Sequence, residues 1–193
     1  MEEKTLNYKA LKYDELSEDA RDKALEEMGD LNTFDGWWED TVEFIAKEWS
    51  EKYGICFETS SLCFDLGRGR QLYFHGRGKI NVENPYKLVY RATGNKGYAL
   101  QAARGVLELG FETHYYGGGD GRTALDVTDF RKAGAPDMPV DLDEWFRDLC
   151  RDFWGILNKE YDYLTSREAI EETIRINEYD FFEDGRRTKT IAA

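Results

Sequence analysis

The most regular hydrophobic pattern in the chain begins at Leu142, after which apolar residues recur at steps of three and four. This spacing places them on one face of an α-helix. Thr165 then begins T-S-R-E, a capping box in which the Thr and Glu side chains satisfy each other's free backbone amides. The pattern predicts a long helix over residues 141–163 and a second helix that begins at Thr165, a pair on which a sheet can pack.

Two shorter helical patterns lie near the N-terminus, after a possible first strand at 8–13. Ser17 is a favourable N-cap residue, and the apolar positions after it predict a helix that stops at Gly29. A second helix is predicted over residues 36–53, because two of its tryptophans and the apolar residues between them recur at helical spacing. Gly54 is its expected end.

Between the helical segments the hydrophobic period shortens towards two, which is typical of strands. Five strands are predicted: Ile55–Glu58, Leu62–Leu66, Gln71–His75, Gly78–Val82 and Leu88–Ala92. A helix over 95–109 and a hairpin over 111–130 follow. Helices clustered in sequence with hairpin-like strands between them are typical of an α+β fold. We therefore predict a single compact domain over residues 1–193, whose mostly antiparallel sheet packs against the long C-terminal helix pair and the two N-terminal helices.

The chain is strongly acidic, with a formal net charge of −13 over 193 residues. Residues 1–66 carry −11 and residues 105–193 carry −9, whereas residues 67–104 carry +7. The overall charge opposes nonspecific attraction to nucleic acid and to anionic membranes. The basic middle segment either pairs internally with the acidic helices or forms a surface patch of its own.

The cysteine count and the apolar runs indicate a cytosolic protein. Three cysteines, an odd number, and the lack of a signal peptide favour a reducing compartment in which thiols pack as small hydrophobes. No apolar run approaches the roughly 20 residues that a membrane-spanning helix needs. We expect no membrane association.

Acidic residues gather on the polar sides of the predicted helices. Glu144, Asp148 and Asp152 recur every four residues, so we expect their Cβ atoms about 5–6 Å apart in a row. Two other helices carry similar rims: Glu39, Asp40 and Glu43, and Glu171 and Glu172. Such rows are either a solvated surface or an array of carboxylates that imitates a nucleic-acid backbone and binds in a partner's basic channel.

The basic middle segment offers an alternative site for nucleic acid. Basic and aromatic residues alternate there, a combination that binds single strands through phosphate contacts and base stacking. The candidate residues are Arg68, Arg70, Tyr73, Arg77 and Lys79. The negative charge of the rest of the chain and the lack of an RNP-type motif weigh against this interpretation.

Candidate catalytic chemistry is sparse. His75, Cys56 and Cys63 do not have the spacing of a zinc ribbon or finger, and half-buried strand positions explain them better. A small enzyme that uses His75, His114 or Cys63 is a second alternative, because nucleophile–base pairs assemble in space. Two glycine-rich stretches match no phosphate-binding motif and fit hairpin turns, at 67–70 and 117–121. We expect no catalytic residues, no cofactor and no metal.

Both ends of the chain carry motifs that resemble a family of small acidic proteins encoded by bacteriophages and prophages. These are Y-D-E-L-S-E-D-A-R-D-K-A at Tyr13–Ala24, W-W-E-D at Trp37–Asp40, and the stretch K-E-Y-D-Y-L-T-S-R-E-A-I to E-D-G at Lys159–Gly185. The middle of the chain matches loosely. Members of the family often have a Gln-Gly-Asp-Gly-like loop there, and the nearest sequence in this chain is G-R-G-R at 67–70. The resemblance implies a viral protein made in a bacterial cytosol, and it carries over no catalytic residues.

Together these features lead to one main hypothesis. Acidic phage accessory proteins without an active site often inhibit host defence by binding a protein complex. We therefore expect a non-enzymatic inhibitor that occludes a host complex handling nucleic acid, such as a CRISPR effector, through its acidic helix faces. A nucleic-acid-binding regulatory role for the middle segment is the alternative, and exposed aromatic residues could also make the chain a homodimer.

Overall fold

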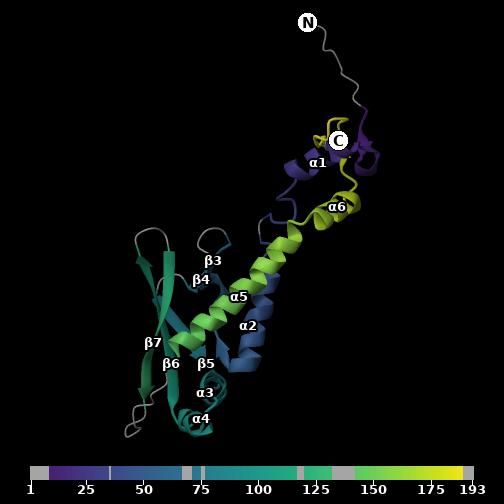
Figure 1. Ribbon diagram of the computed structural model, residues 1–193. Helices are drawn as coiled ribbons and strands as arrows, with labels where there is room; N and C mark the ends of the chain where they lie inside the picture. The colour runs from purple at the N-terminus through teal and green to yellow at the C-terminus, as the bar shows by residue number, and fades with distance from the viewer. Residues whose placement is uncertain are drawn as a thin grey trace. The chain divides into compact units, whose positions relative to one another are not determined.

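The computed structural model describes residues 9–34, 36–66, 71–74, 77–116, 120–131 and 142–188. These ranges hold six α-helices and eight strands, and every strand pair is antiparallel (Figure 1), which confirms the predicted α+β class. The chain separates into two compact units: a terminal unit of Met1–Trp37 with Lys159–Ala193, and a central unit of Trp38–Asn158. A single domain over residues 1–193 stays a prediction.

A four-stranded sheet in the order β2-β5-β6-β7 forms the framework of the central unit. Its strands are β2 (Ile55–Cys56), β5 (Arg77–Val82), β6 (Val106–Tyr116) and β7 (Asp120–Arg131). β6 and β7 form the predicted hairpin, in which Phe111 stands opposite Leu125. A second, two-stranded sheet follows the 3-10 turn η2, and its parts are η2 (Thr59–Ser61), β3 (Leu62–Asp65) and β4 (Gln71–Phe74).

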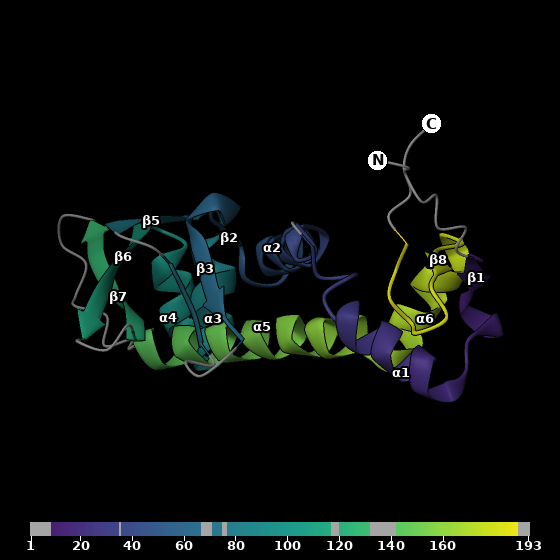
Figure 2. The ribbon, with the colours of Figure 1, turned by 90° about the horizontal axis from the view of Figure 1, so that it is seen from above.

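Helices cover this sheet and share one core with it. They are α2 (Glu39–Tyr53), α3 (Pro85–Thr93), α4 (Lys96–Ala102) and α5 (Asp143–Leu164), the last of which continues into the terminal unit. α2 lies beside α5 (Figure 2), and the Trp49 ring meets Phe146 and Phe153 edge-on at centroid distances of 6.3 and 5.4 Å. Ile80 of β5 and Leu109 of β6 are buried in the same core. The buried residues of α2 thus form one face of the helix, which packs against the core of the central unit.

Gly54 ends α2, as the sequence predicts, although the helix begins at Glu39, later than predicted. Gly54 adopts φ 70°, a left-handed conformation that L side chains rarely take. A Cβ atom there would lie 2.5 Å from the Cβ of Asn84. The Gly54 carbonyl also accepts hydrogen bonds from the amides of Glu83 and Asn84. Glycine is therefore required both by backbone conformation and by close packing.

Two predictions for the central unit are wrong. Residues 88–92, predicted as a strand, lie in α3, and residues 95–109, predicted as one helix, form α4 and the start of β6. The side chains of Asn84 and Asn95 cap α3 and α4, and Gly94, at φ 67°, ends α3. Periodicity alone does not distinguish a short buried helix from a strand, so these polar caps decide the outcome.

The terminal unit is small and mostly helical. Its elements are β1 (Leu11–Lys12), the 3-10 turn η1 (Tyr13–Glu15), α1 (Glu18–Glu27), α6 (Arg167–Ile176) and β8 (Asp180–Phe181). β1 pairs with β8, and α1 packs on α6 around the buried side chains of Ala24, Ile174 and Phe181. The predicted layout grouped α1 and α6 with the sheet, but their buried residues form a separate core.

Serine residues start both helices of this unit. Ser17 accepts a hydrogen bond from the Ala20 amide, which confirms the predicted cap of α1. For α6 the cap is Ser166, one residue later than the predicted Thr165. The Thr165 hydroxyl instead donates to the carbonyl of Tyr161 at 2.8 Å and closes the last turn of α5.

The two segments with the strongest family resemblance, Tyr13–Ala24 and Lys159–Gly185, meet in the terminal unit. Residues of these two segments supply most of the buried side chains of this unit and the N-caps of its helices α1 and α6. Gly185, the last letter of the second motif, adopts φ 87°, and a Cβ atom there would overlap the Ala20 carbonyl oxygen. Residues of both segments therefore have a structural role in this unit.

Candidate functional site

The outward side of α2 is acidic and carries one exposed aromatic ring. Eight of its side chains are exposed, and we call them the α2 face: Glu39, Asp40, Glu43, Phe44, Lys47, Glu48, Glu51 and Lys52. Five are carboxylates and two are lysines. The side chain of Phe44 is 61% exposed, on the side of α2 opposite its buried residues.

The helical spacing that buries one side of α2 also orders this face. Residues four apart are neighbours on a helix, so Phe44 lies between the carboxylates of Asp40 and Glu48 along one row. Glu39 and Asp40 occupy the first turn, where negative charge is favourable to the helix dipole. Within the described ranges, none of the five carboxylates forms an ion pair. The α2 face is therefore an ordered surface with an excess of negative charge, since its five carboxylates outnumber its two lysines.

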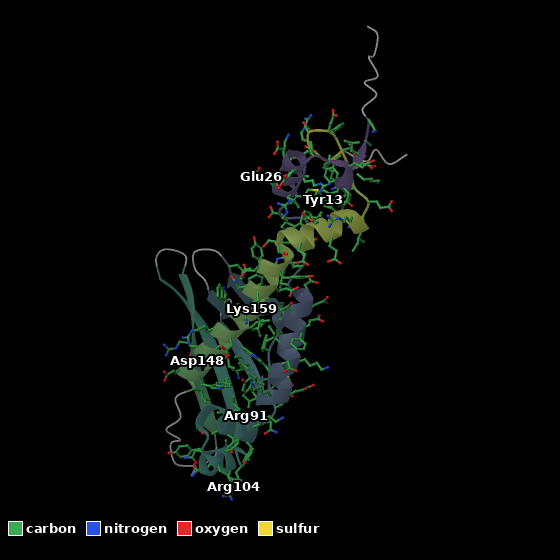
Figure 3. The ribbon with its side chains drawn as sticks, turned by 45° about the vertical axis from the view of Figure 1, so that its right-hand side comes forward. Tyr13, Glu26, Arg91, Arg104, Asp148 and Lys159 are labelled. Atoms are coloured by element: carbon green, nitrogen blue, oxygen red, sulfur yellow. The ribbon has the colours of Figure 1, made fainter. Side chains whose placement is uncertain are left out.

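The row on α5 is present but partly neutralised. Glu144, Asp148 and Asp152 are all exposed on the central part of the chain, as predicted. Nη1 of Arg151 lies 2.7 Å from Oδ1 of Asp148, so the middle carboxylate has a cation beside it (Figure 3 labels Asp148). The α5 row therefore offers less continuous negative charge than the α2 face.

Glu171 is held inside the terminal unit and is not an available carboxylate. Nε of Arg167 and Nη2 of Arg175 lie 2.9 and 3.1 Å from its two oxygens, and the Tyr13 hydroxyl donates to it at 3.1 Å. Partial burial alone would raise the pKa of Glu171, but these hydrogen bonds outweigh it and lower that pKa below its ordinary value. Only its neighbour Glu172 is exposed without an ion pair to a described residue.

Tyr13 is the buried end of the same network. Burial, together with its hydrogen bond to Glu171, raises the pKa of Tyr13 to about 12. The guanidinium groups of Arg175 and Arg21 lie over its ring at 5.3 and 5.7 Å. Arg175 also pairs with Asp14 at 3.1 Å. This arrangement stabilises the fold of the terminal unit, and its tyrosine is not prepared to act as a base.

The predicted nucleic-acid residues are only partly within the described structure. Arg68 and Arg70 lie outside it, and Tyr73 and Arg77 fall in β4 and β5, so the two strands are placed but these side chains are not described. Lys79 is exposed on β5. A nucleic-acid site formed by these five residues therefore stays a prediction.

A different basic surface covers α3 and α4. Residues 85–104 contain four basic residues and no acidic one: Lys87, Arg91, Lys96 and Arg104. Lys87 donates to the Glu51 carbonyl at 2.8 Å, while the other three side chains are exposed (Figure 3 labels Arg91 and Arg104). The rings of Tyr86 and Tyr90 stack at 6.0 Å beside them. We call this set the α3–α4 face.

The structure places two of the three candidate catalytic residues, and one of them, Cys63, lies in β3 opposite Tyr73 of β4. His75 lies outside the described ranges, and His114 stands in β6 opposite Arg122. Cys56 donates from Sγ to the Ser50 hydroxyl at 3.5 Å. Cys150 is buried, which raises the pKa of its thiol to about 12 and keeps it protonated. No group of three or more potential metal ligands occurs among the residues that the structure describes.

The terminal unit also contains an open hollow, which the sequence did not predict. It has a volume of about 510 Å³ and is lined by Asp30, Thr33, Phe34, Trp37 and Tyr161. The rings of Trp37 and Tyr161 are tilted at 53° with centroids 5.7 Å apart. Three aromatic residues and one aspartate thus line one open space.

The loop after α1 positions this hollow. The Asn32 side chain donates to the Leu164 carbonyl at 3.0 Å, and Leu31 packs against the core of the terminal unit. The Thr33 amide donates to the Asp30 carbonyl at 3.1 Å, which closes a turn. The sequence L-N-T-F-D-G-W-W at 31–38 shows that aromatic residues cluster in this loop. It does not show that Tyr161 lies next to them, because that contact depends on the fold.

Comparison with known proteins gives no assignment. No protein-family model, curated protein or solved structure matches this chain. Among its described helices, none is both long enough and apolar enough to cross a membrane. The function of the chain is therefore inferred from its surfaces.

Proposed function

We propose that this protein is a phage-encoded inhibitor of a bacterial defence system, acting in the host cytoplasm. It binds a host protein complex that handles nucleic acid and blocks it by occlusion, without catalysis. The observation that carries this proposal is the α2 face, which bears the exposed ring of Phe44 and five carboxylates that form no ion pair with a described residue.

The composition of the α2 face favours a protein partner with a basic surface. A purely solvated face gains nothing from an exposed phenylalanine, whereas aromatic anchors dominate the binding energy of protein interfaces. Ordered carboxylates are complementary to the arginines and lysines that line a nucleic-acid channel, and they speed association with such a channel. Glu144 and Asp152 on α5 add negative charge in the same unit.

Expression of the protein in bacteria that carry a defined defence system tests this function. We expect phage plating to recover when the wild-type protein is made. Phe44→Ala, combined with Glu43→Lys and Glu48→Lys, should abolish the recovery, because it removes the anchor and reverses the local charge. Leu100→Ala, which truncates an exposed apolar residue on α4, is the matched control and should behave as wild type. Intact defence in the presence of wild-type protein in every system tried would contradict the proposal.

A second candidate function follows from the α3–α4 face. Three exposed basic residues next to a stacked tyrosine pair are suited to a nucleic-acid strand, through phosphate contacts and base stacking. This candidate site on α3 and α4 is separate in sequence from the predicted residues Arg68, Arg70, Tyr73, Arg77 and Lys79, which stay a prediction.

A gel-shift titration with single-stranded DNA and RNA distinguishes the two candidates. Binding that weakens with salt and is lost in the double variant Arg91→Gln, Arg104→Gln would support the second function. No shift at low salt would remove it and leave the inhibitor proposal unaffected.

A further inference from the structure

We propose that the hollow of the terminal unit is a receptor for a guanidinium group, namely an arginine side chain presented by a partner protein. The inference deepens the proposed function by naming the chemistry of one anchor point, and for the identity of the partner it rests on that function. It is argued from Asp30, Thr33, Phe34, Trp37 and Tyr161 alone.

The aromatic rings of the hollow favour a cation. The faces of Trp, Tyr and Phe rings carry negative electrostatic potential and attract a positive group within about 6 Å of the ring centroid. The rings of Trp37 and Tyr161 are tilted at 53° with centroids 5.7 Å apart, which is too close for a cation to lie between them, so a guanidinium would stack on the side of this pair that borders the hollow. Phe34 is 80% exposed and contributes a third ring from the adjoining loop.

The polar groups select the kind of cation. Asp30 is exposed at the hollow and forms no ion pair with a described residue, so its carboxylate can accept from N–H donors. The Thr33 hydroxyl donates to the Asp30 carbonyl at 3.3 Å, which leaves its oxygen lone pairs to accept. A quaternary ammonium has no N–H donor and would leave both acceptors unused.

Among the common cations of proteins, arginine fits these partners best. Its guanidinium is planar, stacks on aromatic faces and presents donors in a fork that matches a carboxylate. Lysine has a compact and strongly hydrated ammonium, so it loses more solvation when it enters an aromatic site. The openness of the hollow also suits a side chain that arrives from the surface of another protein.

A peptide titration followed by NMR tests the inference on the whole chain. The probes are acetyl-Ala-Arg-Ala-amide and the same peptide with lysine, trimethyl-lysine or citrulline in place of arginine. The signal observed is the indole N–H of Trp37, assigned with Trp37→Phe. Because the protein carries a net charge of −13, any cationic peptide is attracted weakly, and the lysine peptide measures that background.

The arginine peptide should shift the Trp37 signal at a lower concentration than the lysine and trimethyl-lysine peptides do, and citrulline should shift it least. Phe34→Ala and Asp30→Asn should each weaken arginine binding about fivefold, the equivalent of about 1 kcal/mol. The controls Ile176→Ala, which removes an exposed apolar side chain of the same unit, and Glu172→Gln should leave it unchanged.

Equal shifts with arginine and lysine, stronger binding of trimethyl-lysine, or unchanged binding by Phe34→Ala would each overturn the inference. Phe34 and Asp30 are exposed, so their variants are expected to fold, and circular dichroism checks this. The titration needs no host protein. It can therefore fail while plating recovery persists, and plating recovery can fail while the peptide binds.

Discussion

The phenol of Tyr13 donates a hydrogen bond to the carboxylate of Glu171 at 3.1 Å, although the two residues are 158 positions apart. Arg167 and Arg175 contact the two oxygens of the same carboxylate. The first and last parts of the chain are thus joined by one polar network in the terminal unit. Sequence motifs from both ends of the chain thus lie in one compact unit.

Removal of the Tyr13 hydroxyl should weaken the terminal unit modestly. Tyr13→Phe keeps the ring among its buried neighbours but leaves Glu171 with two donors instead of three. We expect a loss of about 1 kcal/mol in the free energy of unfolding, measured with urea. Tyr163→Phe, at an exposed position, is the control and should have no effect. An equal loss in both variants would argue against the network.

The lowered pKa of Glu171 makes part of the stability depend on acid. A carboxyl whose folded-state pKa lies below its unfolded value of about 4.3 contributes stability above that value, and this contribution is lost as the pH falls through the folded-state pKa. The difference in unfolding free energy between wild type and Glu171→Gln should therefore be full at pH 6 and shrink below about pH 4. Urea titrations across this range measure it. Glu172→Gln, the exposed neighbour, should show no such dependence.

Two glycines of the central unit should respond in opposite ways to alanine. Gly54→Ala forces a side chain into a left-handed backbone conformation and against Asn84, so we expect a loss of about 1–3 kcal/mol. Gly155→Ala adds a methyl group inside α5, where no atom lies within 4 Å, and should gain about 0.5–1 kcal/mol. Thermal unfolding of the two variants compares them directly. Stabilisation by Gly54→Ala would contradict the close packing described here.

The long helices and their glycine stops could be predicted because the sequence fixes them locally. Leu142 to Leu164 keeps one helical period throughout, and Gly54 follows directly after the last periodic residue of α2. The short segments around Leu88 could not be resolved in the same way. An apolar run of that length suits a buried strand as well as a buried helix, and the Asn84 cap with Pro85 decided between them.

Some residues of the candidate sites could likewise be predicted from the sequence, and others could not. The exposed carboxylates of α2 follow from helical period alone, so Glu39, Asp40 and Glu43 were found in the sequence. The pairing of Glu171 with Tyr13 and the hollow around Trp37 depend on contacts between distant segments, which periodicity does not encode.

The three cysteines should differ in reactivity. Burial holds the pKa of Cys150 at about 12, so it remains a protonated thiol in the core. Cys56 and Cys63 are only half-buried. Brief treatment of the native protein with a maleimide at pH 7.5, followed by peptide mass spectrometry, should label Cys150 least, and denaturation should make all three equal. Preferential native labelling of Cys150 would contradict its burial.

The most direct test of the α2 face is crosslinking at Phe44 in living cells. A photoreactive phenylalanine analogue placed there should capture a host protein during expression in a defence-bearing bacterium, and the yield should fall when Glu43 and Glu48 are changed to lysine. The same analogue at Leu100, which is also exposed, should capture that protein poorly. Absence of a specific product at position 44, or equal capture at positions 44 and 100, would contradict a partner-binding role for the α2 face.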